Sequence, residues 1–193
     1  YNPVFKVLDC LGGLEFDNIF LAGVSTGIYA NNSGRLDVRR LRGQVLIRGI
    51  EIDSSPDLPR LTGVHFWPIW SADAAVLAWQ QANADAVLLR RCDGAFLDQT
   101  FVQGYRSALR LGASVTSTGT ATKVQIGQLQ AANTQYGLLV EADGVTGQIA
   151  NLAHQAEAYG GSGQPMPGGS GLRISGSNNR LQIGNLRIDA VED

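Results

Sequence analysis

The sequence predicts an all-β solenoid, a parallel β-helix in which short strands stack coil upon coil. The first observation is an internal repeat: residues 14–30, LEFDNIFLAGVSTGIYA, are matched without a gap by residues 95–111, AFLDQTFVQGYRSALRL. The second is the alternation of apolar residues within a copy, as at Ile50 and Ile52, which is typical of strands rather than helices. A fixed period in this size range is the signature of solenoid proteins.

Each copy starts with an apolar anchor and has a second apolar residue three positions later. A small–apolar–X–apolar motif follows from the eleventh position after the anchor, but it comes later in the third and sixth copies, and the seventh copy ends before it. The anchors are Phe16, Val38, Leu61, Leu97, Ile126, Ile149 and Ile183. Successive anchors are separated by 22, 23, 36, 29, 23 and 34 residues. The short steps define one coil, and the long steps contain inserted loops, which solenoids place on one face. The chain therefore predicts about seven coils.

The N-terminal half contains three predicted coils. Residues 1–13 are expected to enter as a strand that turns at its glycine pair and partly caps the first coil. The first coil then runs to position 34, the arginine-rich second coil covers 35–57, and the third covers 58–84. The third carries the sequence GVHFWPIWSADAAVLAWQ, and we expect Ala75, Val76 and Ala78 to complete it.

The C-terminal half contains four predicted coils. The fourth has an insertion before its anchor and ends in a Ser/Thr-rich surface loop at 114–121. A Gly- and Pro-rich loop at 159–170 interrupts the sixth coil, and the seventh ends with the chain. We expect residues 1–193 to form one β-helix domain that is a piece of a longer protein. A following domain or a partner subunit would then cover its C-terminal side, because a terminal coil needs a cap.

Composition narrows the possible classes of protein and of functional site. The chain of 193 residues is 44% hydrophobic and has a net charge of −2, so it has enough core for one domain and no general attraction to nucleic acid. No apolar run reaches the length of a membrane span. Cys10 and Cys92 lack metal-site spacing and are expected to be free, buried thiols. His154 is expected to be a core residue, and no cofactor or metal is expected. Trp79 is also expected in the core, with the alternative that it rims the same groove as Trp67 and Trp70.

The repeat aligns outward-facing residues into columns that run along the solenoid. Asn18, Asn151 and Asn185 all lie two positions after an anchor, where corner asparagines can stack their amides between coils. Four further columns are predicted: Glu15, Asp37, Arg60, Phe96, Gln125, Gln148 and Gln182; Asp17, Arg39, Thr62 and Asp98; Phe20, Arg42, His65, Phe101 and Gln130; and Tyr29, Glu51, Leu77, Arg110, Leu139 and Arg173.

The first candidate for chemistry is the pair Glu15 and Asp37, which the columns place one coil apart. Like charges this close raise the pKa of one carboxyl, and an acid beside an ionised carboxylate is what glycosidases use. The alternative is that both are solvated surface groups, or partners of Arg39 and Arg60. Asp17 beside Arg39 predicts a cross-strand ion pair.

The second candidate combines Asp98 with His65, Trp67 and Trp70 on the neighbouring coil. It offers an acid, a proton donor and two aromatic planes on which sugar faces can stack. The alternative is that the two tryptophans pack the inserted loop onto the coil. Arg42, Tyr105 and Arg106 complete the predicted substrate-binding set.

The segments LEFDNIFLAGVSTGIYA, VQIGQLQAANTQYGLLV and LQIGNLRI resemble the right-handed β-helix of the pectate-lyase-like superfamily over nearly the whole chain. Within it, PRLTGVHFWPIWS most resembles phage tailspike depolymerases and related secreted polysaccharide enzymes. The resemblance implies a homotrimer at the virion surface or outside the cell that binds bacterial surface polysaccharide. Only Asn83–Ala84–Asp85 matches one of the polygalacturonase motifs, so no catalytic residue is carried over.

Two functions follow as hypotheses. The first is an enzyme that cleaves a polysaccharide by hydrolysis or elimination, with Asp98, Glu15, Asp37 and His65 as catalytic residues. The second is a non-catalytic shaft or receptor-binding module of a fibre. Two carboxyls about 5–10 Å apart beside the tryptophans would favour hydrolysis, whereas acids paired to arginine would favour binding. A leucine-rich repeat is a further alternative for the fold, but its LxxLxLxxN order is missing.

Overall fold

The computed structural model describes residues 2–157 and 168–189, which form sixteen strands and one helix. Every strand pairing within these residues is parallel. The elements are β1 (Pro3–Leu8), β2 (Leu14–Asp17), β3 (Phe20–Asn31), β4 (Leu36–Arg39), β5 (Arg42–Asp53), β6 (Arg60–Thr62), β7 (His65–Phe66), α1 (Ala74–Asn83), β8 (Asp85–Leu89), β9 (Phe96–Asp98), β10 (Thr100–Gln103), β11 (Ser107–Leu111), β12 (Val124–Ala132), β13 (Tyr136–Val140), β14 (Thr146–Gln155), β15 (Ser170–Ile174) and β16 (Arg180–Asp189). The protein is therefore all-β, and its parallel stacking is consistent with a β-solenoid.

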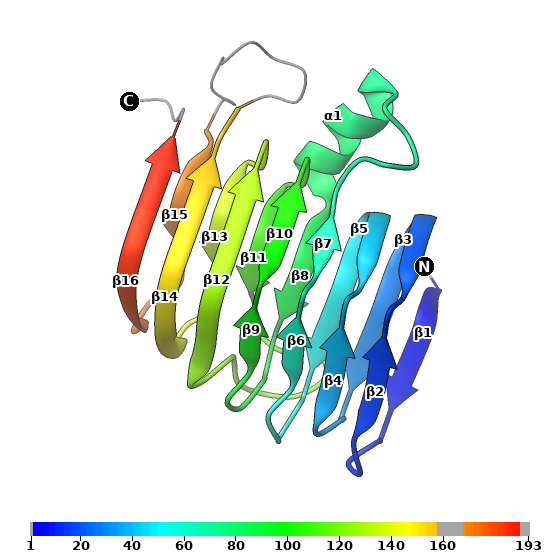
Figure 1. Ribbon diagram of the computed structural model, residues 1–193. Coiled ribbons are helices and arrows are strands. Elements are labelled where there is room, and N and C mark those ends of the chain that lie inside the picture. The colour runs from blue at the N-terminus through cyan, green and yellow to red at the C-terminus, as the bar shows by residue number, and fades with distance from the viewer. Residues whose placement is uncertain (1, 158–167, 190–193) are drawn as a thin grey trace.

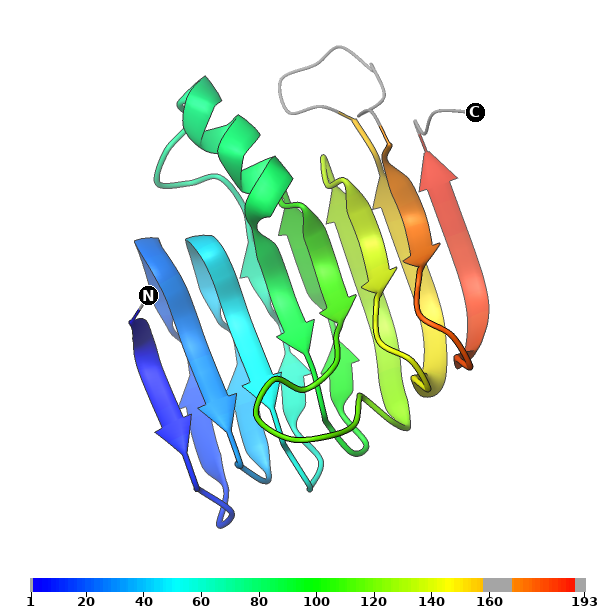
Figure 2. The same ribbon diagram turned by 180° about the vertical axis from the view of Figure 1, so that it is seen from behind.

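The strands form two layers (Figure 1). The front layer contains β2, β4, β6, β7, β9, β10, β12, β14 and β16, and the back layer, seen in Figure 2, contains β1, β8, β11, β13 and β15. The long strands β3 and β5 pass from one layer to the other, since Phe20 pairs with Arg42 in front and Ile28 pairs with Ile50 behind. Each coil thus runs up the front layer and down the back layer.

The predicted repeat is confirmed by the strand register. Each anchor pairs with the next one, from Phe16 opposite Val38 to Ile149 opposite Ile183. The first three predicted columns are also confirmed along their whole length. The fourth column is correct except at one position, where Leu88 rather than Leu77 lies between Glu51 and Arg110.

The exception arises because the third coil closes later than predicted. Residues 74–83 form helix α1, whose first turn is capped by the Asp73 carboxylate accepting from the backbone N–H groups of Ala75 and Val76. Strand β8 then completes the coil with its own small–apolar–X–apolar motif. Alanine and glutamine favour helix, so these inserted residues form a helix and interrupt the repeat of strands. Trp79 lies on α1 and is 45% exposed, so the prediction of a core position was wrong.

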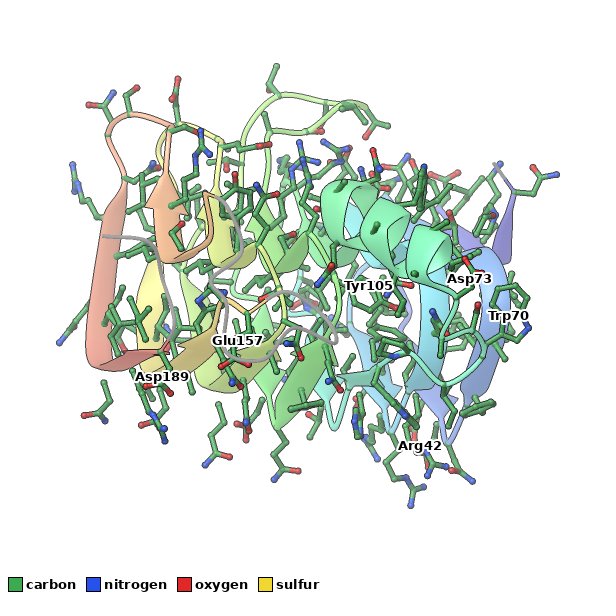
Figure 3. All side chains as sticks on the ribbon, turned by 90° about the horizontal axis from the view of Figure 1, so that it is seen from above. Arg42, Trp70, Asp73, Tyr105, Glu157 and Asp189 are labelled. Atoms are coloured by element: carbon green, nitrogen blue, oxygen red, sulfur yellow. The ribbon has the colours of Figure 1, made fainter. Side chains whose placement is uncertain are left out.

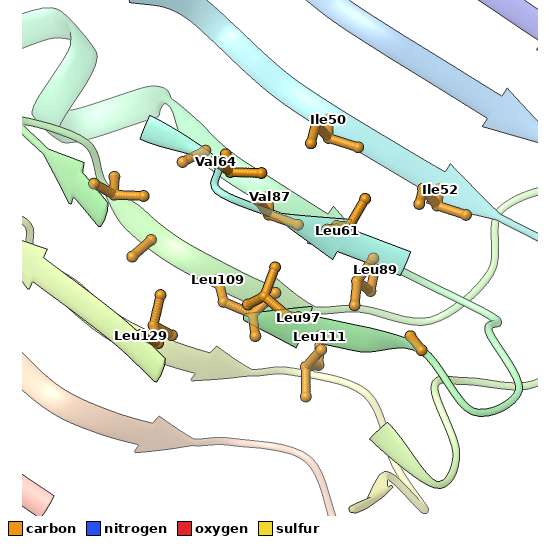
Figure 4. Close-up of a cluster of buried hydrophobic side chains, with 14 of the residues drawn as sticks. Ile50, Ile52, Leu61, Val64, Val87, Leu89, Leu97, Leu109, Leu111 and Leu129 are labelled. Carbon is orange, nitrogen blue, oxygen red and sulfur yellow. The ribbon is translucent and has the colours of Figure 1, made fainter. Parts of the chain in front are cut away.

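The apolar core lies between the two layers (Figure 4). Residues at equivalent positions of successive coils stack on one another, and Leu61 and Leu97 are each 1% exposed. His154 is also buried, and its Nε2–H donates to the Thr134 carbonyl at 3.0 Å, as expected for a structural histidine. No coil can bury its apolar side alone, so neighbouring coils stabilise each other.

The front layer is bent where the first four coils cross it. Asn18, Arg40, Gly63 and Gln99 have φ angles of 55°, 51°, 67° and 51° and separate the lower front strands from the upper ones. In the last three coils β12, β14 and β16 continue through this position. Asn18 therefore occupies a corner, as predicted, whereas Asn151 and Asn185 lie inside strands. Their amides still stack, because Asn185 Nδ2 donates to Asn151 Oδ1 at 2.9 Å.

The other sequence predictions have mixed outcomes. Strand β1 pairs with β3, so the N-terminal segment extends the back layer. Both cysteines are free; Cys92 is buried, and burial raises the pKa of its thiol to about 12, but Cys10 is half-exposed rather than buried. Most of the predicted loop at 159–170 lies outside the described residues.

Candidate functional site

The outer surface of the front layer falls into a charged half and an amide half. Coils one to three carry seven charged side chains there: Glu15, Asp17, Asp37, Arg39, Arg40, Arg42 and Arg60. Coils four to seven carry mostly neutral amides: Gln99, Gln125, Gln128, Gln130, Gln148, Asn151, Gln182 and Asn185. The arginine-rich acid cluster and the neutral amides therefore lie at different ends of the same face, and Asp98 is an acid within the amide half.

Glu15 and Asp37 do lie on adjacent strands, but an arginine binds both. Arg39 Nη1 is 3.3 Å from Glu15 Oε1, and Arg39 Nη2 is 2.5 Å from Asp37 Oδ2. The predicted ion pair of Asp17 with Arg39 is wrong, since Asp17 instead pairs with Arg40 through an Nε–Oδ1 bond of 2.8 Å. The hydrogen bond from Arg40 lowers the pKa of Asp17. This acid cluster is thus compensated by arginine.

Asp98 supports the bend of the front layer. Its Oδ1 accepts the backbone N–H of Gln128 at 2.9 Å. Gly127 of the next coil lies beside the Asp98 carboxylate. A Cβ atom at position 127 would be 2.3 Å from Asp98 Oδ1, so the glycine makes room for the carboxylate. Asp98 also lines a hollow of about 460 Å³ with Gln125, Gln148 and Gln182. It is accessible to a ligand, and one of its oxygens already has a structural partner.

Four rings form an aromatic cluster on the upper front layer. The His65 ring lies 4.2 Å from Trp67 and 4.9 Å from Phe101, centroid to centroid, and Phe20 meets Trp67 edge-on at 6.4 Å. Burial, followed by the positive charge of Arg42, lowers the pKa of His65. Both effects favour the neutral imidazole, and the ring packs as part of this aromatic cluster.

Arg42 lies between Phe20 and His65 in the same column, and its Nη2 donates to Asn18 Oδ1 at 3.0 Å. It borders a hollow of about 450 Å³, whose lining also includes Gln99 and Phe101. These two residues also line a second hollow of about 740 Å³ that extends to β16. The two hollows therefore lie next to each other along the outer face of the front layer, and together they extend from Asn18 to Arg187. We refer to the pair as the axial groove.

Three residues of the predicted site, Tyr105, Trp70 and Arg106, lie outside the axial groove. Tyr105 is completely buried between the layers, and its hydroxyl accepts the Val45 N–H at 2.9 Å. Figure 3 shows Arg42 on the outer side of the front layer and Tyr105 inside. The Trp70 ring packs directly over Gly23, where an added Cβ would lie 2.6 Å from Cε2 of the ring. This tryptophan therefore fixes the inserted loop while its side chain remains half exposed.

Arg106 belongs to a separate cluster in the back layer. It holds the fully buried carboxylate of Asp85 with two hydrogen bonds to Oδ1, at 2.9 and 2.7 Å, and one to Oδ2 at 2.9 Å. Arg48 and Arg110 bind the same carboxylate at 3.2 and 3.0 Å. The repeat pattern does not predict this cluster, and the three-residue match Asn83–Ala84–Asp85 is too short to indicate it.

The described residues contain no group of three or more histidine, cysteine or acidic side chains that could hold a metal ion. Their one helix is too short to cross a membrane. Comparison of the chain with family models, with curated proteins and with solved structures found no match.

Proposed function

We propose that this protein is a right-handed parallel β-helix of the pectate-lyase-like type that binds a polysaccharide along the axial groove without cleaving it. The course of the chain supports the handedness: in Figure 1 the front strands run upwards, the back strands run downwards, and successive coils advance to the left. The groove crosses coils about 4.8 Å apart, so seven coils would accommodate an oligosaccharide about 30 Å long.

The observation that carries the proposal is the chemistry of the groove. Its described lining combines Phe101 and His65 with the amides of Gln99, Gln128, Gln130, Asn151 and Asn185, and includes no aspartate or glutamate. Amides both donate to and accept from sugar hydroxyls, and aromatic faces stack on the C–H faces of sugar rings. Of the acids nearby, Glu15, Asp17 and Asp37 are bound to arginine, whereas Asp98 accepts the Gln128 N–H. The described part of the groove thus lacks a pair of unpaired carboxyls, which favours a binding module over a hydrolase.

Binding is tested with a panel of bacterial surface polysaccharides and the variant Phe101→Ala. Because Phe101 lies where the two hollows join, losing its ring should weaken binding by up to about tenfold, the effect of about 0.5–1.5 kcal/mol for one aromatic contact. The matched control is Trp79→Ala, which removes an exposed ring from α1 and should leave affinity unchanged. Equal affinities for wild type and Phe101→Ala would contradict the groove as the binding site.

Cleavage remains the second candidate, because Asp98 borders a hollow and His65 lies on the same face. Asp98→Asn is the appropriate variant, since an amide oxygen can still accept the Gln128 N–H and preserve the bend. A binding module yields no product from any polysaccharide of the panel. Reducing ends that appear with wild type and disappear with Asp98→Asn would establish a hydrolase, and unsaturated products would establish a lyase.

We also propose a homotrimer at the virion surface or outside the cell, on the tailspike resemblance alone. Sedimentation equilibrium tests the assembly: a trimer mass for the isolated chain supports it, and a monomer mass at high concentration contradicts it for this segment.

A further inference from the structure

We infer that the two ends of the groove bind different kinds of sugar. The end at coils two and three binds a carboxylate-bearing sugar through Arg42, and the rest of the groove binds neutral sugars. This inference rests on the proposed polysaccharide binding and specifies the class of polysaccharide. It predicts an acidic heteropolysaccharide whose direction in the groove is set by the position of its carboxylate.

The first argument is the uncompensated charge of Arg42. Its neighbours Arg39 and Arg40 are held by carboxylates, whereas Arg42 makes no ion pair within the described part of the chain. Its hydrogen bond to the neutral amide of Asn18 orients the guanidinium without neutralising it. A fixed planar guanidinium can bind a carboxylate through two parallel N–H···O bonds.

The second argument is the environment of that guanidinium. The hollow beside Arg42 is lined by His65 and Phe101, and no acid belongs to its described lining. An acidic sugar has an apolar ring face next to its carboxylate. Its ring could pack on Phe101 while its carboxylate meets Arg42, and water excluded by the rings would strengthen the ion pair.

The third argument is the contrast with the other end of the groove. From Gln99 to Asn185 the described lining offers amides, aliphatic side chains such as Leu129 and Leu152, the Phe101 ring and one threonine, and no charged group. The next charge, Arg187, is already paired with Asp189 at 2.9 Å. A second carboxylate would find no free cation there, whereas neutral sugars would find several amide partners.

The test measures the affinity of the full chain for each polysaccharide of the panel, in its native form and after carboxyl reduction, which converts uronic acids into neutral hexoses. The variants are Arg42→Gln and, as the matched control, Arg60→Gln. Arg60 is also exposed on the front layer and unpaired among the described residues, but it lies over Phe96 at 5.8 Å and outside the groove.

We expect the polysaccharides that bind to be acidic, and carboxyl reduction or Arg42→Gln to weaken binding at least tenfold. Arg60→Gln should change affinity less than twofold, and Arg42→Gln should not weaken binding of the reduced form further. Equal binding of native and reduced forms, or equal loss for both in Arg42→Gln, overturns the inference and leaves the proposed function standing. Binding of none of the polysaccharides by wild type overturns the proposed function itself and the inference with it.

Discussion

At the scale of single residues, the direction of each side chain decides its role. Tyr105 and Phe101 are four positions apart, yet Phe101 lines the groove and Tyr105 lies in the core. Burial raises the pKa of the Tyr105 phenol well above its ordinary value, so the hydroxyl remains protonated. It satisfies the Val45 N–H, a backbone donor at the bend of β5 that has no access to water.

Replacing Tyr105 by Phe should therefore affect stability and leave binding unchanged. The variant leaves the buried Val45 N–H without its acceptor, which costs about 1–3 kcal/mol. Urea unfolding measures this loss, and polysaccharide affinity measured under native conditions provides the comparison. Reduced affinity in a variant with wild-type stability would instead restore the substrate-binding role predicted for Tyr105.

At the scale of elements, the insertions hold distant coils together. The loop at 112–121 leaves the fourth coil and crosses the back layer (Figure 2). There the Asp53 carboxylate of the second coil accepts the backbone N–H groups of Val115 and Thr116 at 3.0 and 3.3 Å. Burial raises the pKa of Asp53, but hydrogen bonds from Ser114, Val115 and Thr116 outweigh it, so the net effect is a lowered pKa.

Acid should therefore release this loop. Because the folded state lowers the pKa of Asp53, its contribution is complete above the ordinary value of about 3.9 and is lost as the pH falls through the lower folded value. Asp53→Ala, which removes the acceptor, should lose about 1–3 kcal/mol at pH 6, and the difference from wild type should shrink towards pH 3. Hydrogen exchange at Val115 and Thr116 measures the release directly. Exchange that is equally slow in both proteins at pH 6 would contradict the role of Asp53.

At the scale of the whole molecule, stability comes from stacking one coil on the next. Leu97 packs in the core between the equivalent residues Leu61 and Ile126. Removing its side chain opens a cavity that the surrounding parallel strands cannot fill without losing their own register. A defect in a central coil should therefore weaken the structure on both sides of it.

Leu97→Ala should lower the free energy of unfolding by about 2–5 kcal/mol, the range for a buried leucine that leaves a cavity. The matched control is Leu11→Ala, because Leu11 is 54% exposed and its loss should cost under about 0.5 kcal/mol. Urea denaturation of the three proteins measures both values. Similar losses for both variants would show that the repeat does not predict which leucines form the core.

The sequence by itself determined the repeat, the seven anchors and three complete columns of outward residues. These follow from local periodicity, because stacked parallel strands in register must repeat the same alternation of apolar and polar residues. Only the tertiary structure decided that Leu88 replaces Leu77, that Arg40 rather than Arg39 binds Asp17, and that Tyr105 points inwards. Each of these depends on an insertion, a bend or a side-chain direction, and none of them has a period that a sequence pattern can reveal.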